Sequence, residues 1–237
     1  MIDRPSPLGV HLDELRQRVF RVLLSVLLFS GAAFYFAKDL IWILKWPASA
    51  QIKTLAVFSP TAAILSYLKV ALAFGLIGSL PVLLYETWMF LLPALDPRHI
   101  RSGFLFIFFG TALFISGAAF NFFILIPASI RFLLGLGQGD LQFIISLESY
   151  ISFVLLFLLA GGFVFEIPIL VFFLSKYGVI TAEKAIKGWR VAILVILLAA
   201  GILTPTPDAV NMLLMALPMF VLYFVCIGIA RFVEKDK

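Results

Sequence analysis

The residue that most strongly suggests chemistry is Glu166, a carboxylic acid in the middle of the apolar run 152–174. An ionised carboxylate inside hydrocarbon costs about 3 kcal/mol or more, so such residues usually face a partner, a cavity or a transport pathway. Pro168 follows two residues later and favours a kink, because proline lacks a backbone donor. These two residues together predict a functional carboxyl beside a helix break. The alternative is a protonated Glu166 that is hydrogen-bonded within a tight bundle.

A second group of ionisable residues lies in the polar stretch 11–18, directly before the first apolar segment. Glu14 and Arg18 are four residues apart and would pair on one face of a helix, which is worth about 0.2–0.5 kcal/mol. Local pairing is the simpler interpretation. The functional interpretation is a carboxylate among arginines that binds a cationic peptide, since a carboxylate accepts two parallel N–H bonds from a guanidinium.

No enzyme motif is present in the sequence. His-Glu-x-x-His, the P-loop, Gly-x-Ser-x-Gly and a cysteine pair for metal are all absent, and the single cysteine is Cys226. The two histidines, His11 and His99, lie in different segments. The aspartates nearest the apolar segments all fall in predicted loops: Asp39, Asp96, Asp140 and Asp208. We therefore expect no catalysis, no cofactor and no metal.

The composition is that of an integral membrane protein. The chain has 237 residues, 63% hydrophobic and only 13% charged, whereas soluble domains are about 25% charged. This length predicts a single membrane domain, 1–237. The net charge of +5 does not indicate nucleic acid, because the basic residues lie at the ends of apolar segments. The N-terminus lacks a cleavage-site pattern, so the first apolar segment is expected to remain.

The hydropathy pattern predicts an all-α protein with six membrane spans, at about 19–37, 63–86, 103–126, 150–174, 190–203 and 210–230. The last two spans are short, and the prolines in 204–208 forbid one continuous helix through them. A short hairpin implies thinned lipid or a covering partner. Between spans, 37–62 is expected to lie along the membrane surface and 128–136 to form a short helix.

The distribution of Lys and Arg predicts the orientation. If the N-terminus is cytoplasmic, thirteen basic residues face inside and four face outside. The inside set is Arg4, Arg16, Arg18, Arg21, Arg98, Arg101, Lys176, Lys184, Lys187, Arg190, Arg231, Lys235 and Lys237, and the outside set is Lys38, Lys45, Lys53 and Arg131. This bias predicts that both termini are cytoplasmic.

Short motifs follow one another in a characteristic order along nearly the whole chain. They are His-Leu-x-Glu-Leu-Arg-x-Arg at 11–18, Ser-Pro-Thr at 59–61, Pro-Val-Leu-Leu-Tyr at 81–85, Pro-Ala-Leu at 93–95, Ser-Tyr-Ile-Ser-Phe at 149–153, Phe-Glu-x-Pro at 165–168, Thr-Pro and Pro-Asp within 204–208, and Ala-Leu-Pro-Met at 216–219. Each motif is weak by itself. The ordered set resembles the TatC family, the core receptor subunit of twin-arginine protein translocases.

The resemblance implies a concave, cup-like bundle of six helices in the cytoplasmic (inner) membrane of a prokaryote. It implies binding of the Arg-Arg signal peptides of folded cargo through Glu14, with Arg16 in the same motif. It also implies that Glu166 and Pro168 lie on the concave face. Single-span partners of the TatA/TatB type would dock near Thr204, Asp208 and Met212, giving a hetero-oligomer in membrane lipid. Coupling to the proton gradient is a further hypothesis.

The sequence departs from the family pattern at several positions. His99 stands where the family has a second signal-binding glutamate, so Asp96 is the nearest carboxylate that would compensate. Glu86 stands where glutamine is usual, which adds a carboxyl near the inner end of the second span. Other departures are Ala62, Met212 and Phe224.

Two rival functions follow from the same residues. A small proton- or ion-coupled transporter would use Glu166, Glu86 and Lys69, although Lys69 is expected to extend toward the outer interface rather than pair within the bundle. A divergent membrane scaffold without signal-peptide selectivity would account for His99, Met212 and Phe224.

Overall fold

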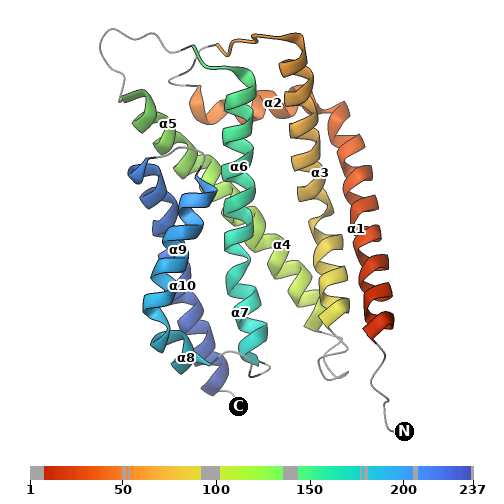
Figure 1. Cartoon of the computed structure of the whole chain (residues 1–237), viewed down its shortest axis with the longest axis vertical. Coiled ribbons are helices and arrows are strands. Elements are labelled where there is room, and N and C mark those ends of the chain that lie inside the picture. Colours follow the sequence, from red (N-terminus) through yellow and green to blue (C-terminus); the bar gives the residue numbers. More distant parts are fainter. Residues whose placement is uncertain are drawn as a thin grey trace.

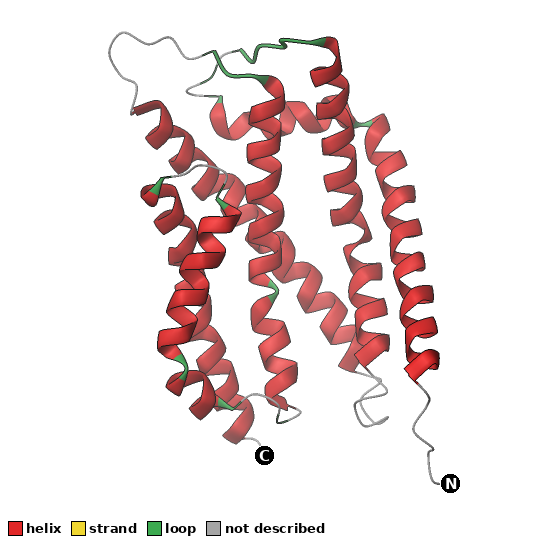
Figure 2. Ribbon diagram, viewed as in Figure 1, coloured by secondary structure: helices red, strands yellow, loops and turns green. Residues whose placement is uncertain are grey.

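The computed structural model describes residues 8–49, 52, 54–91, 102–135, 144–176, 178, 181–204 and 208–235. Helices dominate these ranges, and loops are confined to the connections (Figure 2). The elements in chain order are α1 (Leu8–Tyr35), α2 (Ala37–Lys45), the 3-10 turn η1 (Trp46–Ala48), α3 (Pro60–Leu91), α4 (Ser102–Phe120), the π-helical turn η4 (Asn121–Leu125), α5 (Ile126–Gly135), α6 (Leu147–Phe165), α7 (Ile167–Lys176), α8 (Ala182–Lys187), α9 (Trp189–Leu203) and α10 (Ala209–Lys235). The predicted all-α class is confirmed.

The six predicted apolar segments all appear as helices. Five are long and apolar enough to cross a membrane: Leu12–Tyr35, Pro60–Phe90, Gly103–Gly135, Leu147–Lys176 and Ala209–Glu234. The sixth, α9, has only 15 residues and is short, as predicted. The expectation that the last span is also short was wrong, because α10 continues for 27 residues through Pro218.

The helices form one bundle, with α1 and α3 side by side at one edge and the α9–α10 hairpin at the other (Figure 1). The helix α6 lies between them and forms the core of the bundle: in the most apolar part of Leu147–Lys176, which α6 begins, 61% of the residues are buried, against 11% in that of Leu12–Tyr35. The beginning of α1, the end of α3 and the end of α10 all lie at the same end of the bundle (Figure 1). The first and second spans can therefore share a site at that end.

The predicted short helix at 128–136 is present as α5, Ile126–Gly135. The helix α5 continues directly from α4 through η4, so one helical segment runs from Gly103 to Gly135. The π turn places the buried Asn121 side chain against α6, where its Nδ2 donates to the Phe157 carbonyl. This contact requires glycine at 161, because a Cβ there would overlap the Asn121 side chain. Such π turns are rare and occur mostly as single turns inside α-helices.

The segment after α1 forms α2, which lies across the end of the bundle (Figure 1). Its buried face carries Ala37, Ile41 and Leu44, while Trp42 is exposed. The Tyr150 hydroxyl of α6 donates to the Leu44 carbonyl over 2.7 Å. This amphipathic helix occupies the region predicted to lie along the membrane surface.

Candidate functional site

The ionisable residues of the N-terminal motif form a charged cluster with the end of α3. Arg18 lies between two carboxylates: its Nη2 donates to Glu14 Oε1 and its Nη1 donates to Glu86 Oε2 over 3.0 Å. Arg21, one turn further along α1, donates from Nη1 to both Glu86 oxygens over 3.2 and 3.3 Å. The predicted local Glu14–Arg18 pair is therefore present, and it is one part of a four-residue network: Glu14, Arg18, Arg21 and Glu86.

Burial differs sharply within this charged cluster. The side chain of Glu86 is 7% exposed and that of Arg18 is 13% exposed, whereas Glu14 is 32% and Arg21 is 56% exposed. A buried charge is tolerated only when it is paired and hydrogen-bonded. The Arg18–Glu86 pair is therefore the anchored part of the cluster, and Glu14 and Arg21 are the parts accessible from outside.

An apolar groove lies between α1 and α3 beside this cluster. It encloses about 360 Å³. Arg18 and Glu86 line it together with mainly apolar neighbours: Leu15, Val19, Val22, Leu23, Leu83, Thr87 and Phe90. A cationic side chain with an apolar stem fits such a lining, since arginine buries its methylenes and keeps its guanidinium with polar groups.

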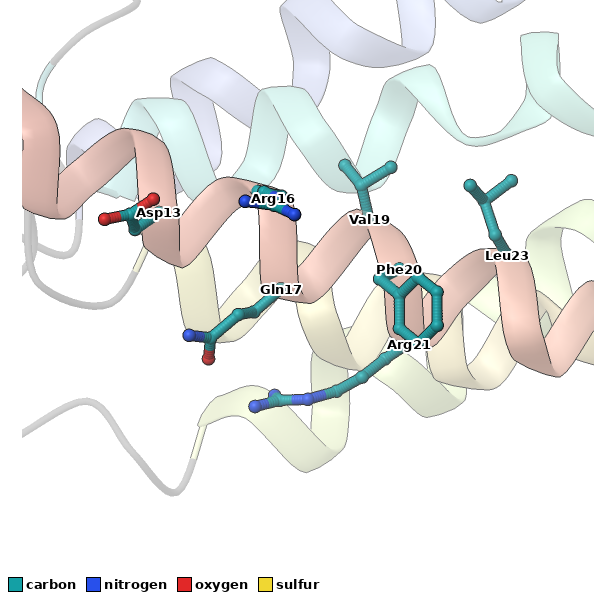
Figure 3. Close-up of a pocket in the computed structure, with 7 residues that line it drawn as sticks. All are labelled: Asp13, Arg16, Gln17, Val19, Phe20, Arg21 and Leu23. Atoms are coloured by element: carbon teal, nitrogen blue, oxygen red, sulfur yellow. The ribbon is translucent and has the colours of Figure 1, made fainter.

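The remaining residues predicted for signal-peptide binding lie elsewhere. Arg16 is exposed on a different face of α1, where it lines a surface hollow of about 610 Å³ with Asp13, Gln17 and Phe20 (Figure 3). Every residue lining this hollow comes from α1 itself. Asp96 and His99 fall outside the residues that the structure describes.

Glu166 lies at the break predicted from Pro168, because α6 ends at Phe165 and α7 begins at Ile167. The residue is 7% exposed. Its carboxyl points toward α4: an added Cβ at Gly110 would lie 3.5 Å from Oε2. Among the described residues, Oε1 finds no hydrogen-bond partner. The alternative prediction of a carboxyl hydrogen-bonded within the bundle therefore gains no support at this oxygen.

The residues predicted to recruit partners lie at the turn between α9 and α10. Thr204 is 8% exposed, and its Oγ1 donates to the Ala200 carbonyl over 2.7 Å. Asp208 precedes α10 and accepts from the backbone and side-chain nitrogens of Asn211 over 2.7 and 2.9 Å, as an N-cap does. Met212 lies beside Gly201, so this turn is closely packed.

The expectation for Lys69 was wrong. Its Nζ donates to Glu148 over 2.9 Å and to the Ser152 hydroxyl over 3.0 Å, so it pairs with the start of α6. The Glu86 carboxylate is bound by Arg18 and Arg21, and neither arginine is a described partner of Glu166. Glu166, Glu86 and Lys69, which the rival transporter would use together, therefore share no described ion pair. Within the described residues, His, Cys, Asp and Glu form no group that could hold a metal ion.

Comparison with known proteins gives consistent matches along the chain. Residues 10–218 match the family described as Sec-independent protein translocase protein (TatC). The protein of that name from Carboxydothermus hydrogenoformans is 35% identical over 237 residues, covering 100% of this chain and 98% of the relative. The protein of that name from Aquifex aeolicus is 39% identical, covering 98% and 97%.

Two solved structures share the fold. A crystal structure described as the twin arginine translocase receptor TatC superimposes with a TM-score of 0.85 at 36% identity, covering 94% of this chain and 99% of that one. A second, of the same receptor in DDM, gives a TM-score of 0.84 at 37% identity, covering 92% and 98%.

Proposed function

Because the chain belongs to the TatC family of Sec-independent protein translocase proteins, we propose that it binds Arg-Arg signal peptides of folded proteins through Glu14. The predicted resemblance is confirmed. The chain is a receptor subunit of the twin-arginine translocase, a transport subunit rather than an enzyme, and it works in a membrane complex with other Tat subunits.

The observation that carries the proposal is the contact between Glu14 and the Arg18 guanidinium. This contact supports the proposal, because the Glu14 carboxylate accepts a guanidinium at the end of the bundle where α1 begins. Charge-assisted bonds between a guanidinium and a carboxylate are about twice as strong as neutral ones and are geometrically selective. A peptide arginine arriving at Glu14 would find the same acceptor.

The other residues of the site have supporting roles in the proposal. Asp96 supplies a loop carboxylate in place of the one replaced by His99. Arg16 is exposed on α1 beside Asp13 and contacts the peptide segment flanking the arginines (Figure 3). Arg16 lies in the N-terminal part of α1 and Asp96 follows α3 in the sequence, and the positive-inside bias supports a cytoplasmic location for this end of the bundle.

The partner and membrane assignments extend the same proposal. Single-span TatA/TatB-type subunits dock along α9, which has only 15 residues, and α10, near Thr204, Asp208 and Met212. Glu166 and Pro168 lie within the membrane on the concave face. The complex belongs to the inner membrane of a prokaryote, with both termini in the cytoplasm.

Peptide binding to the protein in nanodiscs tests the proposal directly. A fluorescent signal peptide with Arg-Arg is titrated against the protein, and an otherwise identical Lys-Lys peptide is the control. We expect tighter binding of the Arg-Arg peptide, because an ammonium cannot bind a carboxylate with two parallel N–H bonds. Equal binding of the two peptides, with or without added partner subunits, would contradict the proposal and favour the scaffold function.

A further inference from the structure

The charged cluster contains a carboxylate that the proposed function does not use. Glu86 is almost fully enclosed between α1 and α3, yet it receives guanidinium nitrogens from both Arg18 and Arg21. Arg18 connects it directly to Glu14. Two carboxylates therefore already hold two guanidiniums side by side, which is the charge arrangement that two consecutive arginines of a ligand require.

The two resident arginines are held very differently. Arg18 is 13% exposed and bonds to a carboxylate on each side, so its removal would leave the buried Glu86 with reduced compensation. Arg21 is 56% exposed and reaches Glu86 through a single nitrogen over 3.2 and 3.3 Å. Only the Arg21 side of this pair is exposed, and water can stabilise its guanidinium once it leaves the carboxylate. Arg21 can therefore leave for water much more easily than Arg18.

From this difference we infer that Glu86 is a further carboxylate of the signal-peptide site, beside Glu14, and that Arg21 is its resident occupant, displaced when a peptide arginine binds. The inference rests on the proposed function of the same site. Arg18 stays in place between Glu14 and Glu86. One peptide guanidinium takes the place of Arg21 on Glu86, and its neighbour contacts Glu14.

Charge balance supports exchange rather than simple addition. Among the described residues, the resting cluster has two carboxylates and two guanidiniums, so an added peptide arginine would leave the buried Glu86 facing an excess of positive charge. Exchange with Arg21 keeps two guanidiniums on Glu86, and the second peptide arginine adds its charge at the more exposed Glu14. The groove beside Glu86 also has apolar walls, including Leu83 and Phe90, that can pack against the methylenes of the incoming arginine.

The first experiment compares Glu86→Gln with the protein itself, using the Arg-Arg and Lys-Lys peptides in nanodiscs. We expect Arg-Arg affinity to fall about tenfold or more, because a neutral amide cannot replace a charged acceptor. Lys-Lys affinity should change much less, so the selectivity ratio falls. Glu183→Gln is the matched control, since it removes the same charge from an exposed pair on α8 and should change neither affinity.

The second experiment tests displacement. Arg21→Gln removes the competitor and should increase Arg-Arg affinity about threefold to tenfold, with Arg231→Gln on α10 as the control for the lost charge. The double variant Glu86→Gln with Arg21→Gln should show no such increase, because Arg21 competes only through Glu86. This non-additivity separates displacement from a general reduction in positive charge.

The outcomes distinguish the inference from the function on which it rests. No selectivity in the unmodified protein would overturn the proposed function. Selectivity that Glu86→Gln leaves unchanged would overturn the role of Glu86 alone. Equal loss of both affinities would assign Glu86 a purely structural role in holding α1 on α3, and Arg21→Gln binding more weakly or equally would overturn displacement.

Discussion

Two carboxyl groups, Glu86 and Glu166, are equally enclosed in this bundle but have opposite surroundings. Glu86 is bound by two guanidiniums from α1, whereas Glu166 lies at a helix break with Oε1 unpaired among the described residues. The described residues explain the burial of Glu86 but not that of Glu166. The first is a site with its own occupants; the second is a polar group whose Oε1 has no partner among the described residues.

The largest effect on the stability of the isolated protein should come from removing the arginine that compensates the buried Glu86 carboxylate. Arg18→Met leaves Glu86 buried with only the exposed Arg21, so we expect a loss of about 3–5 kcal/mol in the free energy of unfolding. Unfolding in mixed micelles on titration with a denaturing detergent measures it. The control is Lys187→Met in the fully exposed pair with Glu183, where about 0.5 kcal/mol or less is expected. Similar small losses in both variants would contradict the view that Glu86 depends on Arg18.

A smaller effect is expected on peptide affinity at the accessible end of the same cluster. Glu14→Gln should weaken binding of the Arg-Arg peptide by about 1–3 kcal/mol, because one charge-assisted bond becomes a neutral one. Fluorescence titration in nanodiscs measures the change. Unchanged affinity would remove Glu14 from the site while leaving its pairing with Arg18 intact.

Glu86 and Glu166 also show which features of the site could be predicted from the sequence. The Glu14–Arg18 pair follows from spacing along one helix, and the break at Glu166 follows from Pro168. The Arg18–Glu86 contact joins residues 68 positions apart and depends on how α1 and α3 pack, which periodicity does not specify. One feature of the sequence could have predicted this contact. A carboxyl at the inner end of an apolar span needs a cation, and the first span places arginines at that end.

Other differences have the same physical origin. Lys69 was expected to extend to the interface, but Glu148 lies within reach only because α6 packs against α3. Likewise, the π turn at Asn121, which joins α4 to α5 and packs on α6, was not predicted from the sequence. Local propensity predicted where helices occur; contacts between helices decided which polar groups meet.

A still smaller effect is expected at the Lys69–Glu148 pair, which is charged like the Arg18–Glu86 pair but lies 40% and 35% exposed. Glu148→Gln should lower the free energy of unfolding by about 1 kcal/mol or less, since water already stabilises both charges. The effect should shrink further at high salt, unlike that of Arg18→Met. A loss as large as that of Arg18→Met would mean that exposure does not explain the difference between the two ion pairs.

The smallest effect on the isolated protein is expected at Glu166. Glu166→Ala removes a carboxyl that breaks no described ion pair, so Arg-Arg peptide affinity should stay unchanged and stability should shift by only about 1 kcal/mol. The same variant should impair transport or assembly with partner subunits, because the group that completes this carboxyl would lie outside the chain. Copurification with single-span partners and export of a folded cargo measure this, with Glu183→Gln as the control. Full assembly and export in the Glu166→Ala variant would show that Glu166, like Glu86, is accounted for within the bundle, and the contrast between the two carboxyls would then reflect packing alone.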